Sequence, residues 1–407
     1  MRTGGGDRTS GSGRVSKSSR GRCLRRWLLG LAGAASLGVL LLVLPLRGPV
    51  QPTRLAVPYG PDSVRIVAGE RYRAGPVKRT FLGSHYRELW TEALVVEALR
   101  LDRFDGGLWP VREGGGRETR SLHLVSDSGR RWVFRSADKE LIRLLPSALS
   151  RSLVAWMVQD QVSGLHPAGV LVAASLQNAL GLPTAEPRLV ALPDQERLGS
   201  FRPRFAGLLG TLQEAPGGGQ SDSGLRPGTV PWKTSEVLAV MDSGLDHRVD
   251  GPSFLTARLL DFLLNDWDRH PGQWWWTPVE KSWGTLWRPV PVDRDQALSW
   301  YDGVLVRLVR VWVPGLTEFG PEYPDLRGLI HNSREIDRRF LVGLSRREWD
   351  SVTGFVRTRL TDSVIDAAVR RMPEPWWRAS GPMVAAALKQ RRDRLPQVAD
   401  RFYRFLH

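Results

Sequence analysis

The sequence is poor in the residues that build disulfide-rich or metal-rich proteins. Its 407 residues include one cysteine, Cys23, which excludes a disulfide framework and any cysteine-based zinc site. Seven histidines are too few for a histidine-rich metal cluster to be expected. Hydrophobic residues make up 42% of the chain and charged residues 25%, so the body is neither disordered nor a polytopic membrane protein.

Lysine is scarce as well, since arginine supplies most of the positive charge. The formal net charge is +16, which on its own would suit nucleic-acid binding. Much of this excess lies in residues 1–26, and the rest of the chain has no block of interleaved basic and aromatic residues. We therefore expect no nucleic-acid partner.

The N-terminal residues predict a membrane anchor. Residues 1–26 are rich in Gly, Ser and Arg and are expected to form a disordered cytoplasmic segment, while residues 27–46 carry no charge. A helix of about 20 residues spans about 30 Å, which is enough for one bilayer crossing. The basic flank predicts a cytoplasmic N-terminus and an extracytoplasmic main domain. No small-x-small cleavage site follows, so we expect an uncleaved signal anchor.

The length of the remaining chain predicts two lobes or two small domains, each able to bury a core. Residues 47–75 are rich in Pro and Gly and are expected to be a linker. Residues 76–216 are predicted to form an N-lobe with a small antiparallel sheet, and residues 217–407 a mostly helical C-lobe, which together give an α+β fold. Within the N-lobe, the hydrophobic pattern predicts two helices and a strand, over 146–160, 170–180 and 204–213.

Residues 107–136 predict the sheet of the N-lobe. Their alternation of polar and apolar residues indicates a three-stranded antiparallel meander. Gly114, Gly115 and Gly116 lie at the tip of its first hairpin, where backbone N–H groups could approach a phosphate. The alternative is a flexible hairpin loop. Lys139 follows the third strand, and no other lysine occurs between residues 78 and 233.

The candidate chemistry lies in two acidic segments. An apolar helix over 255–264 is followed by a loop that presents Asp266, Asp268, Arg269 and His270, and a later strand ends in 293–295 with the sequence Asp-Arg-Asp. Neither segment contains a Ser or Cys nucleophile in an elbow, so acyl transfer is disfavoured. Two carboxylate loops about 25 residues apart suit Mg²⁺ (or Mn²⁺), which prefers oxygen ligands shared with substrate phosphates.

These segments resemble the catalytic core of atypical members of the protein-kinase-like fold. HipA-type kinases, lipid kinases and secretory-pathway kinases carry an Asp-x-His or Asp-Arg-His loop similar to Asp268-Arg269-His270, and CotH-type kinases have an Asp-x-Asp after the second strand. Bacterial envelope proteins with DWDRH and DRDQA stretches are similar to this chain too. The resemblance implies a two-lobed kinase-like fold that uses ATP or another nucleotide with Mg²⁺.

The resemblance also implies roles in the catalytic half. Asp268 would be the carboxylate that takes the proton of the acceptor hydroxyl, in a loop with Arg269 and His270. Asp293 would be a Mg²⁺ ligand, with Asp295 as a second or alternative ligand. Gln273 falls where the fold usually has an asparagine metal ligand, so its amide oxygen is assigned to the metal as well.

The nucleotide-binding half is assigned to the N-lobe. Lys139 is expected to pair with the phosphates, with Asp160 or Glu140 as its acidic partner. Arg135, in the third strand, lies nearer to the position of the usual lysine, but an arginine is not equivalent to a lysine there. Glu214, at the end of the last strand of this lobe, completes the predicted nucleotide-binding set.

Several alternatives stay open. Residues 268–270 could be a polar helix-capping loop, and residues 293–295 a solvated turn. Residues 274–276 are three tryptophans, expected to pack the loop against the C-lobe, with a sugar-stacking surface as the alternative. The whole chain could be a catalytically silent pseudokinase that serves as an envelope binding module. It could also be a metal-dependent phosphoesterase, with the site residues Asp266, Asp268, His270, Asp293 and Asp295. The phosphoryl acceptor is not predicted.

Overall fold

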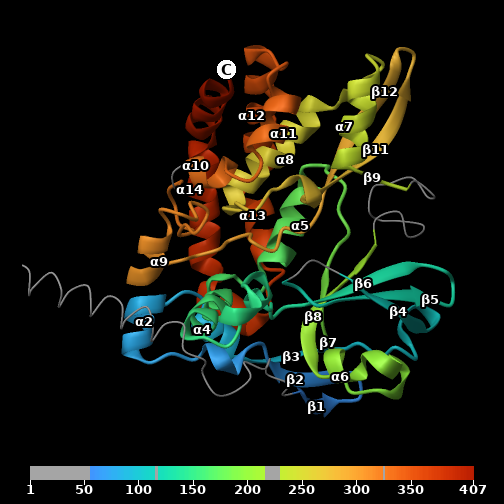
Figure 1. Ribbon diagram of the computed structural model, residues 1–407, viewed down its shortest axis with the longest axis vertical. Coiled ribbons are helices and arrows are strands. Elements are labelled where there is room, and N and C mark those ends of the chain that lie inside the picture. The colour runs from blue at the N-terminus through green and yellow to red at the C-terminus, as the bar shows by residue number, and fades with distance from the viewer. Residues whose placement is uncertain (1–55, 115–117, 216–229, 324–325) are drawn as a thin grey trace, which may run out of the picture.

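The computed structural model describes residues 56–114, 118–215, 230–323 and 326–407. They form a sheet-rich N-lobe and a helical C-lobe (Figure 1). The predicted cytoplasmic segment (1–26) and anchor (27–46) lie outside the described residues, as do Gly115 and Gly116. Among the helices of the described ranges, none combines the length and the apolar character needed to cross a bilayer.

The N-lobe is built on one eight-stranded sheet with the strand order β1-β2-β3-β7-β8-β6-β5-β4. Its strands are β1 (Ala56–Gly60), β2 (Ser63–Val67), β3 (Ala93–Ala98), β4 (Leu108–Gly114), β5 (Ser121–Ser126), β6 (Arg131–Ser136), β7 (Arg188–Leu192) and β8 (Leu208–Glu214). Neighbouring strands are antiparallel except β3 and β7, which are parallel. The predicted meander is confirmed as β4, β5 and β6.

The sheet is larger than the small one predicted, because it includes residues assigned to a linker. The linker prediction is wrong for 56–67, which form β1 and β2. In β2, Val64 and Ile66 are buried and the intervening Arg65 is exposed, which is the alternation of a strand with one face on a core. The flanking Pro58, Gly60 and Pro61 conceal this short pattern in the sequence.

Helix α5 (Gly169–Ala179) packs against α8 (Gly251–Leu264) and α13 (Asp362–Val369) of the C-lobe, and further short helices belong to the N-lobe. Helix α5 confirms the helix predicted over 170–180, whereas the one predicted from residue 146 begins later, as α4 (Leu153–Asp160). Ser152 caps α4 by accepting a hydrogen bond from the backbone of Ala155 at 3.2 Å. The strand predicted over 204–213 is present as β8, which begins later, at Leu208. The first residues of the predicted range belong to the short helix α6 (Arg202–Phe205). Two further short helices, α2 (Pro76–Leu82) and α3 (Arg87–Thr91), precede β3.

The C-lobe surrounds helix α8 (Gly251–Leu264), which is buried along nearly its whole length. The other helices are α7 (Thr234–Ser243), α9 (Val304–Val309), α10 (Leu326–Ile330), α11 (Arg334–Leu341), α12 (Arg346–Arg359), α13 (Asp362–Val369) and α14 (Glu374–Leu406). A second sheet has the order β10-β12-β11-β9, with β9 (Trp232–Lys233), β10 (His247–Val249), β11 (Trp274–Lys281) and β12 (Gly284–Pro291). Trp274 and Trp276 are buried against Phe254 of α8, so two of the three consecutive tryptophans pack in the core.

The lobes share one hydrophobic core, with a smaller cluster under the outer strands of the large sheet. Hydrogen bonds also join them. Tyr86 donates to the carbonyl of Leu298 at 2.8 Å, and Trp376 of α14 donates to the carbonyl of Leu89 at 2.8 Å. The first bond holds the loop after β12, where the candidate site lies, against the N-lobe, and the second holds α14 against it.

Candidate active site

The two acidic turns lie side by side because Arg269 joins them. Arg269 is fully buried and donates from Nη1 to the side-chain oxygen of Gln273 at 2.9 Å and to the carbonyl of Val292 at 2.8 Å. The backbone N–H of Val292 in turn donates to the carbonyl of Gln273 at 3.1 Å. The loop after α8 and the loop after β12 are thereby fixed to each other.

A buried ionic network lies beneath both turns. Asp261 of α8 contacts Arg258 at 2.7 Å, Arg269 at 3.3 Å and the guanidinium of Arg294. Arg258 continues to Asp337 of α11 at 2.8 Å. Buried charges are costly unless they are paired, and each of these arginines has a carboxylate partner within the network. The network makes the two turns one rigid unit.

Asp268 is held by two amides rather than by an ion pair of this network. Its Oδ1 accepts from Asn332 at 2.8 Å, and its Oδ2 accepts from the side-chain nitrogen of Gln273 at 3.5 Å. Asn332 comes from the segment between α10 and α11, 64 residues along the chain. These contacts orient the carboxylate without neutralising its charge, which suits a proton acceptor.

Asp293 adopts a left-handed backbone conformation with φ of 58°. Such a conformation in a non-glycine residue is uncommon and is concentrated at functional sites. Its carboxylate lies 3.4 Å from Arg135 of β6. Burial raises the pKa of Asp293, but the charges of Arg135, Lys139 and Arg269 outweigh burial, so its pKa lies below the ordinary value.

Asp295 lies 2.6 Å from Lys139, the lysine that follows β6. Burial raises the pKa of Asp295 to about 7; Lys139 opposes this shift, and the negative charge of Asp293 adds to it. Burial lowers the pKa of Lys139, but Asp295, Glu118 and Asp293 outweigh it, and that pKa is raised. Two carboxylates with pKa values pushed apart beside a buried lysine are typical of a functional site.

The predicted acidic partners of Lys139 are wrong. Lys139 contacts Glu118 at 3.5 Å in addition to Asp295. Asp160 is instead buried against Arg87 at 2.5 Å, which takes its carboxylate away from the cleft. Glu140 is held in an ion pair with Arg143 at 2.5 Å, and it also pairs with Arg120 of the segment before β5.

Charged residues of both lobes line one cleft. An open cavity of about 660 Å³ is bordered by Arg135 and Lys139 from the N-lobe and by Asp293 and Asp295 from the C-lobe. A second cavity, of about 540 Å³, has mostly apolar walls from α5, residues 183–187 and β12. The two cavities share Val170, Gln213 and Asp293 in their walls.

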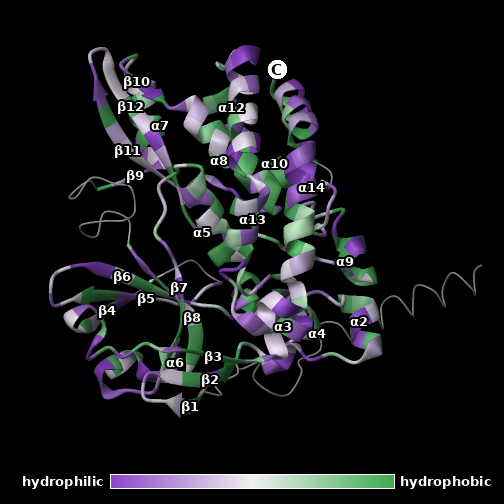
Figure 2. Ribbon diagram, turned by 180° about the vertical axis from the view of Figure 1, so that it is seen from behind, coloured by the Kyte–Doolittle hydropathy of each residue, from purple (hydrophilic) through white to green (hydrophobic). Residues whose placement is uncertain are grey.

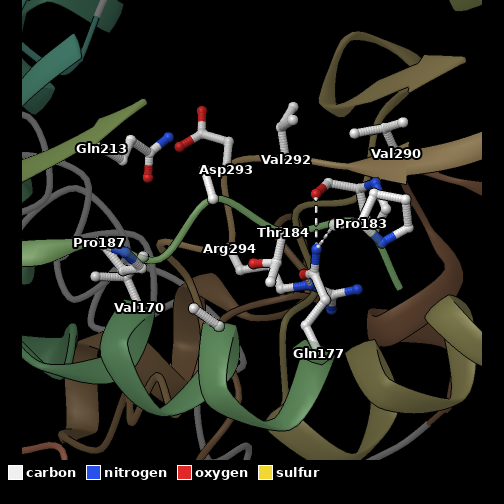
Figure 3. Close-up of a pocket in the computed structure, with 13 residues that line it drawn as sticks. Val170, Gln177, Pro183, Thr184, Pro187, Gln213, Val290, Val292, Asp293 and Arg294 are labelled. Atoms are coloured by element: carbon white, nitrogen blue, oxygen red, sulfur yellow. Dashed lines mark hydrogen bonds between the residues drawn. The ribbon is translucent and has the colours of Figure 1, made fainter. Parts of the chain in front are cut away.

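Figure 3 shows how neighbouring residues face opposite ways in this second cavity. The carboxylate of Asp293 points away from the side chain of Arg294, which turns to Gln177 of α5 and donates to its side-chain oxygen at 2.7 Å. Gln177 also donates to the carbonyl of Pro291 at 3.2 Å. Arg294 is thus a structural residue that fixes the turn, and Asp293 is presented to the cleft.

The other predicted site residues lie outside these cavity walls. His270 is exposed, and its Nδ1 accepts from the backbone of Gly272 at 3.1 Å, so it caps a short turn. Gly114 ends β4, where an added Cβ would meet the ring of His123 at 2.3 Å. Glu214 pairs with Trp132 in the sheet register, and its neighbour Gln213 lines both cavities instead.

The oxygens available for a metal are those of Asp293 and Asp295. The amide oxygen of Gln273, predicted as a ligand, already accepts from Arg269. In the described part of the chain, no three His, Cys, Asp or Glu side chains gather closely enough to hold a metal by themselves. Two carboxylates still fit Mg²⁺, because this ion keeps several waters and is completed by substrate phosphates.

The phosphoesterase alternative loses support at Asp266. This residue is fully buried, and burial is the main cause that raises its pKa to about 8. Asp266 also lies outside the walls of both cavities, so its carboxyl group is not presented to the cleft, unlike that of Asp295. His270, which that alternative shares with the kinase-like prediction, serves the turn described above.

No protein-family model matches the sequence, and the comparison with curated proteins gives no significant match. Among solved structures, the proinflammatory kinase CtkA of Helicobacter pylori is 13% identical, with 70% of this chain and 94% of that chain covered and a TM-score of 0.35. HipA of Shewanella oneidensis is 12% identical, with coverage of 73% and 67% and a TM-score of 0.33. The Rio2 kinase of Chaetomium thermophilum is 15% identical, with coverage of 70% of each chain and a TM-score of 0.31.

The molecule's own arrangement is two-lobed, with a sheet-rich N-lobe and a helical C-lobe that enclose a charged cleft. This is the two-lobed α+β fold that the acidic motifs predict.

Proposed function

We propose that the protein is a kinase-like phosphotransferase that uses a nucleotide and Mg²⁺ (or Mn²⁺). One observation carries the proposal: Lys139 and Arg135 of the N-lobe meet Asp295 and Asp293 of the C-lobe across a cleft. Phosphoryl transfer needs little beyond positioning and neutralisation of phosphate charge, and these four groups can supply both. ATP or another nucleotide would be the donor.

Each side chain has a distinct part in this proposal. Asp293 and Asp295 would hold the metal, which when bound neutralises phosphate charge. Lys139 and Arg135 would exchange their present carboxylate partners for phosphate oxygens, and Arg135 could do so with two parallel N–H groups. Asp268, oriented by Asn332 and Gln273, would accept the proton of the acceptor hydroxyl.

We also propose that residues 27–46 anchor the chain in a membrane, with the kinase-like body on the extracytoplasmic side. The uncharged run and its basic flank support this proposal. The proposed partners are therefore the membrane and a hydroxyl-bearing phosphoryl acceptor, with no nucleic acid.

Nucleotide binding by the full-length protein in detergent tests the proposal. Isothermal titration should show binding that needs Mg²⁺ and is lost in Asp293→Asn. The Asp268→Asn variant should bind nucleotide like the wild type but lose phosphoryl transfer. The matched control Asp350→Asn, an exposed carboxylate of α12, should keep both. No binding of any nucleotide at millimolar concentration would contradict the proposal.

A second candidate is a catalytically silent binding module. It is favoured by the ion pairs that already occupy both cations and both carboxylates of the cleft, and by the contact that Arg269 makes with the oxygen of Gln273. This alternative predicts that nucleotide binds without metal, or does not bind, and that Asp268→Asn has no effect in cells.

A further inference from the structure

An apolar surface lies on the flank of the molecule, away from the cleft walls. Helix α9 and the residues after it expose six large hydrophobic side chains, namely Val304, Leu308, Val309, Val311, Trp312 and Val313. Val311 is 79% exposed and Trp312 is 77% exposed, which is rare for such side chains in a folded protein. Helix α2 lies against α9 and adds Val77 and Phe81 (Figures 1 and 2). We call these eight side chains the apolar patch.

The apolar patch is held in place by buried residues. Val306 of α9 is buried, and Gly303 lies so close to α2 that an added Cβ would be 2.4 Å from the backbone nitrogen of Gly83. Asp302 accepts backbone hydrogen bonds from Ser84 at 3.1 Å and His85 at 3.0 Å. The exposed side chains are therefore presented by an ordered surface.

The rim of the apolar patch is basic. Arg307 and Arg310 both pair with Glu318, at 3.0 and 3.3 Å, and no other acidic residue occurs in residues 303–318. Residues 303–318 thus carry one excess positive charge, next to the carboxylate of Asp302. Arg79 of α2 pairs with Glu88 at 3.4 Å, and Arg73, before α2, pairs with Glu70 at 2.6 Å, so these two add no net charge. Hydrophobic residues, a tryptophan and arginines in one surface are typical of segments that lie in the headgroup region of a bilayer.

The length of the chain before β1 brings a bilayer within reach. The proposed anchor ends at residue 46, and β1 begins at Ala56. Residues 47–55 can span at most about 30 Å even when fully extended. The body is thus kept next to the membrane, where an apolar surface gains by entering the lipid interface.

We propose that the apolar patch docks on the lipid headgroup interface of the membrane that holds the anchor. The proposal rests on the proposed anchoring and is independent of phosphoryl transfer. Docking would fix the orientation of the body on the bilayer, so that the charged cleft opens at a constant height above the lipid. Anionic lipids would strengthen the contact through Arg307 and Arg310.

Lipid-dependent quenching in the full-length protein tests the proposal. Cys23 is replaced by serine, and one exposed position is changed to cysteine and labelled with an environment-sensitive fluorophore. Val311→Cys reports on the apolar patch, and Phe355→Cys on α12, which is exposed and remote from α9, is the matched control. The protein is reconstituted in phosphatidylcholine vesicles, with or without phosphatidylglycerol, that carry headgroup-spin-labelled lipid.

The proposal predicts that vesicle-bound protein loses fluorescence at position 311 and not at 355, with a larger loss when phosphatidylglycerol is present. Adding Leu308→Ser and Trp312→Ser should remove the loss at 311. Because these side chains are exposed, the double variant should keep its melting temperature and its nucleotide binding in detergent. Because the quenching assay does not depend on phosphoryl transfer, a failure of the proposed enzyme activity would be distinguished from a failure of membrane docking.

Three outcomes would overturn the proposal. Protein that floats with the vesicles but shows equal, weak quenching at 311 and 355 has an anchor and no docked patch. Protein that does not float at all has neither. A change in the fluorescence of the label at 311 that grows with protein concentration, together with energy transfer between labelled copies, would mean that a second copy of the protein covers the apolar patch.

Discussion

Replacing Asp261 with asparagine removes the carboxylate that three buried arginines share. Arg258, Arg269 and Arg294 all contact Asp261, and each of these four side chains is at most 3% exposed. Removing one partner of a buried ion pair costs about 3–5 kcal/mol, because the remaining charge stays out of water. Asparagine keeps the size and shape of the side chain, so the loss should come from charge.

The magnitude should lie near the lower end of this range. Arg258 keeps a two-point contact with Asp337, at 2.8 and 3.1 Å, and Arg269 keeps its carbonyl and amide acceptors. Without Asp261, the one short hydrogen bond that Arg294 keeps is the bond to the side-chain oxygen of Gln177, at 2.7 Å. Burial already lowers the pKa of Arg294 to about 10 against the opposing effect of Asp261, so this residue should suffer most. We expect a loss of about 3 kcal/mol in the free energy of unfolding.

Urea unfolding of the full-length protein in detergent measures this loss. Asp350→Asn is the control, since its ion pair with Arg346 is half-exposed and should cost less than about 1 kcal/mol. The Asp261→Asn variant should also lose nucleotide binding, because Arg269 and Arg294 position both acidic turns. Equal, small losses in the two variants would refute the inference that this network holds the site together.

Three further predictions concern stability and the site. Burial lowers the pKa of His166 to about 3, so from pH 6.5 down to 3 the unfolded chain takes up a proton that the folded chain does not. Stability should fall with pH in that window, by about 1.4 kcal/mol per unit at most, and His166→Gln should flatten melting temperature against pH. Burial raises the pKa of Asp302, but the hydrogen bond and charge of His85 outweigh it and bring the pKa to about 2. Asp302→Asn should therefore lower the free energy of unfolding by roughly 2 kcal/mol above pH 4. This loss should disappear as the pH falls towards 2. A loss that stays constant with pH would contradict the contribution assigned to the Asp302 carboxylate. Lys139→Met should weaken nucleotide binding, measured by titration on protein that circular dichroism shows to be folded. Unchanged binding would exclude Lys139 from the phosphate site.

The sequence could predict the two acidic turns because their chemistry is written in short local motifs. Asp268 and Asp293 each follow an apolar helix or strand, and the chain geometry after α8 and β12 brings these ends together. The meander could be predicted for the same reason, since its alternation is local. The two turns are joined because Arg269 and Arg294, one from each motif, both contact the buried Asp261 of α8. The sequence did not indicate this shared contact.

Contacts between distant segments could not be predicted. Asp160 and Glu140 are close to Lys139 in the sequence, yet Lys139 is paired with Asp295, 156 positions later in the chain. Asn332 carries no motif, so nothing in the sequence marks it as a partner of Asp268. Glu118 could have been found, as the acidic residue beside the glycine-rich hairpin. The interpretation of residues 56–67 as a linker failed because turn residues hide two five-residue strands.

The most direct test of the shared cleft is electron paramagnetic resonance of Mn²⁺ bound to the full-length protein with a nucleotide. The account predicts that Mn²⁺ becomes immobilised when nucleotide is present, and that Asp293→Asn and Asp295→Asn each weaken this binding. Immobilised Mn²⁺ that is unaffected by both substitutions would contradict the claim that these two carboxylates form the metal site.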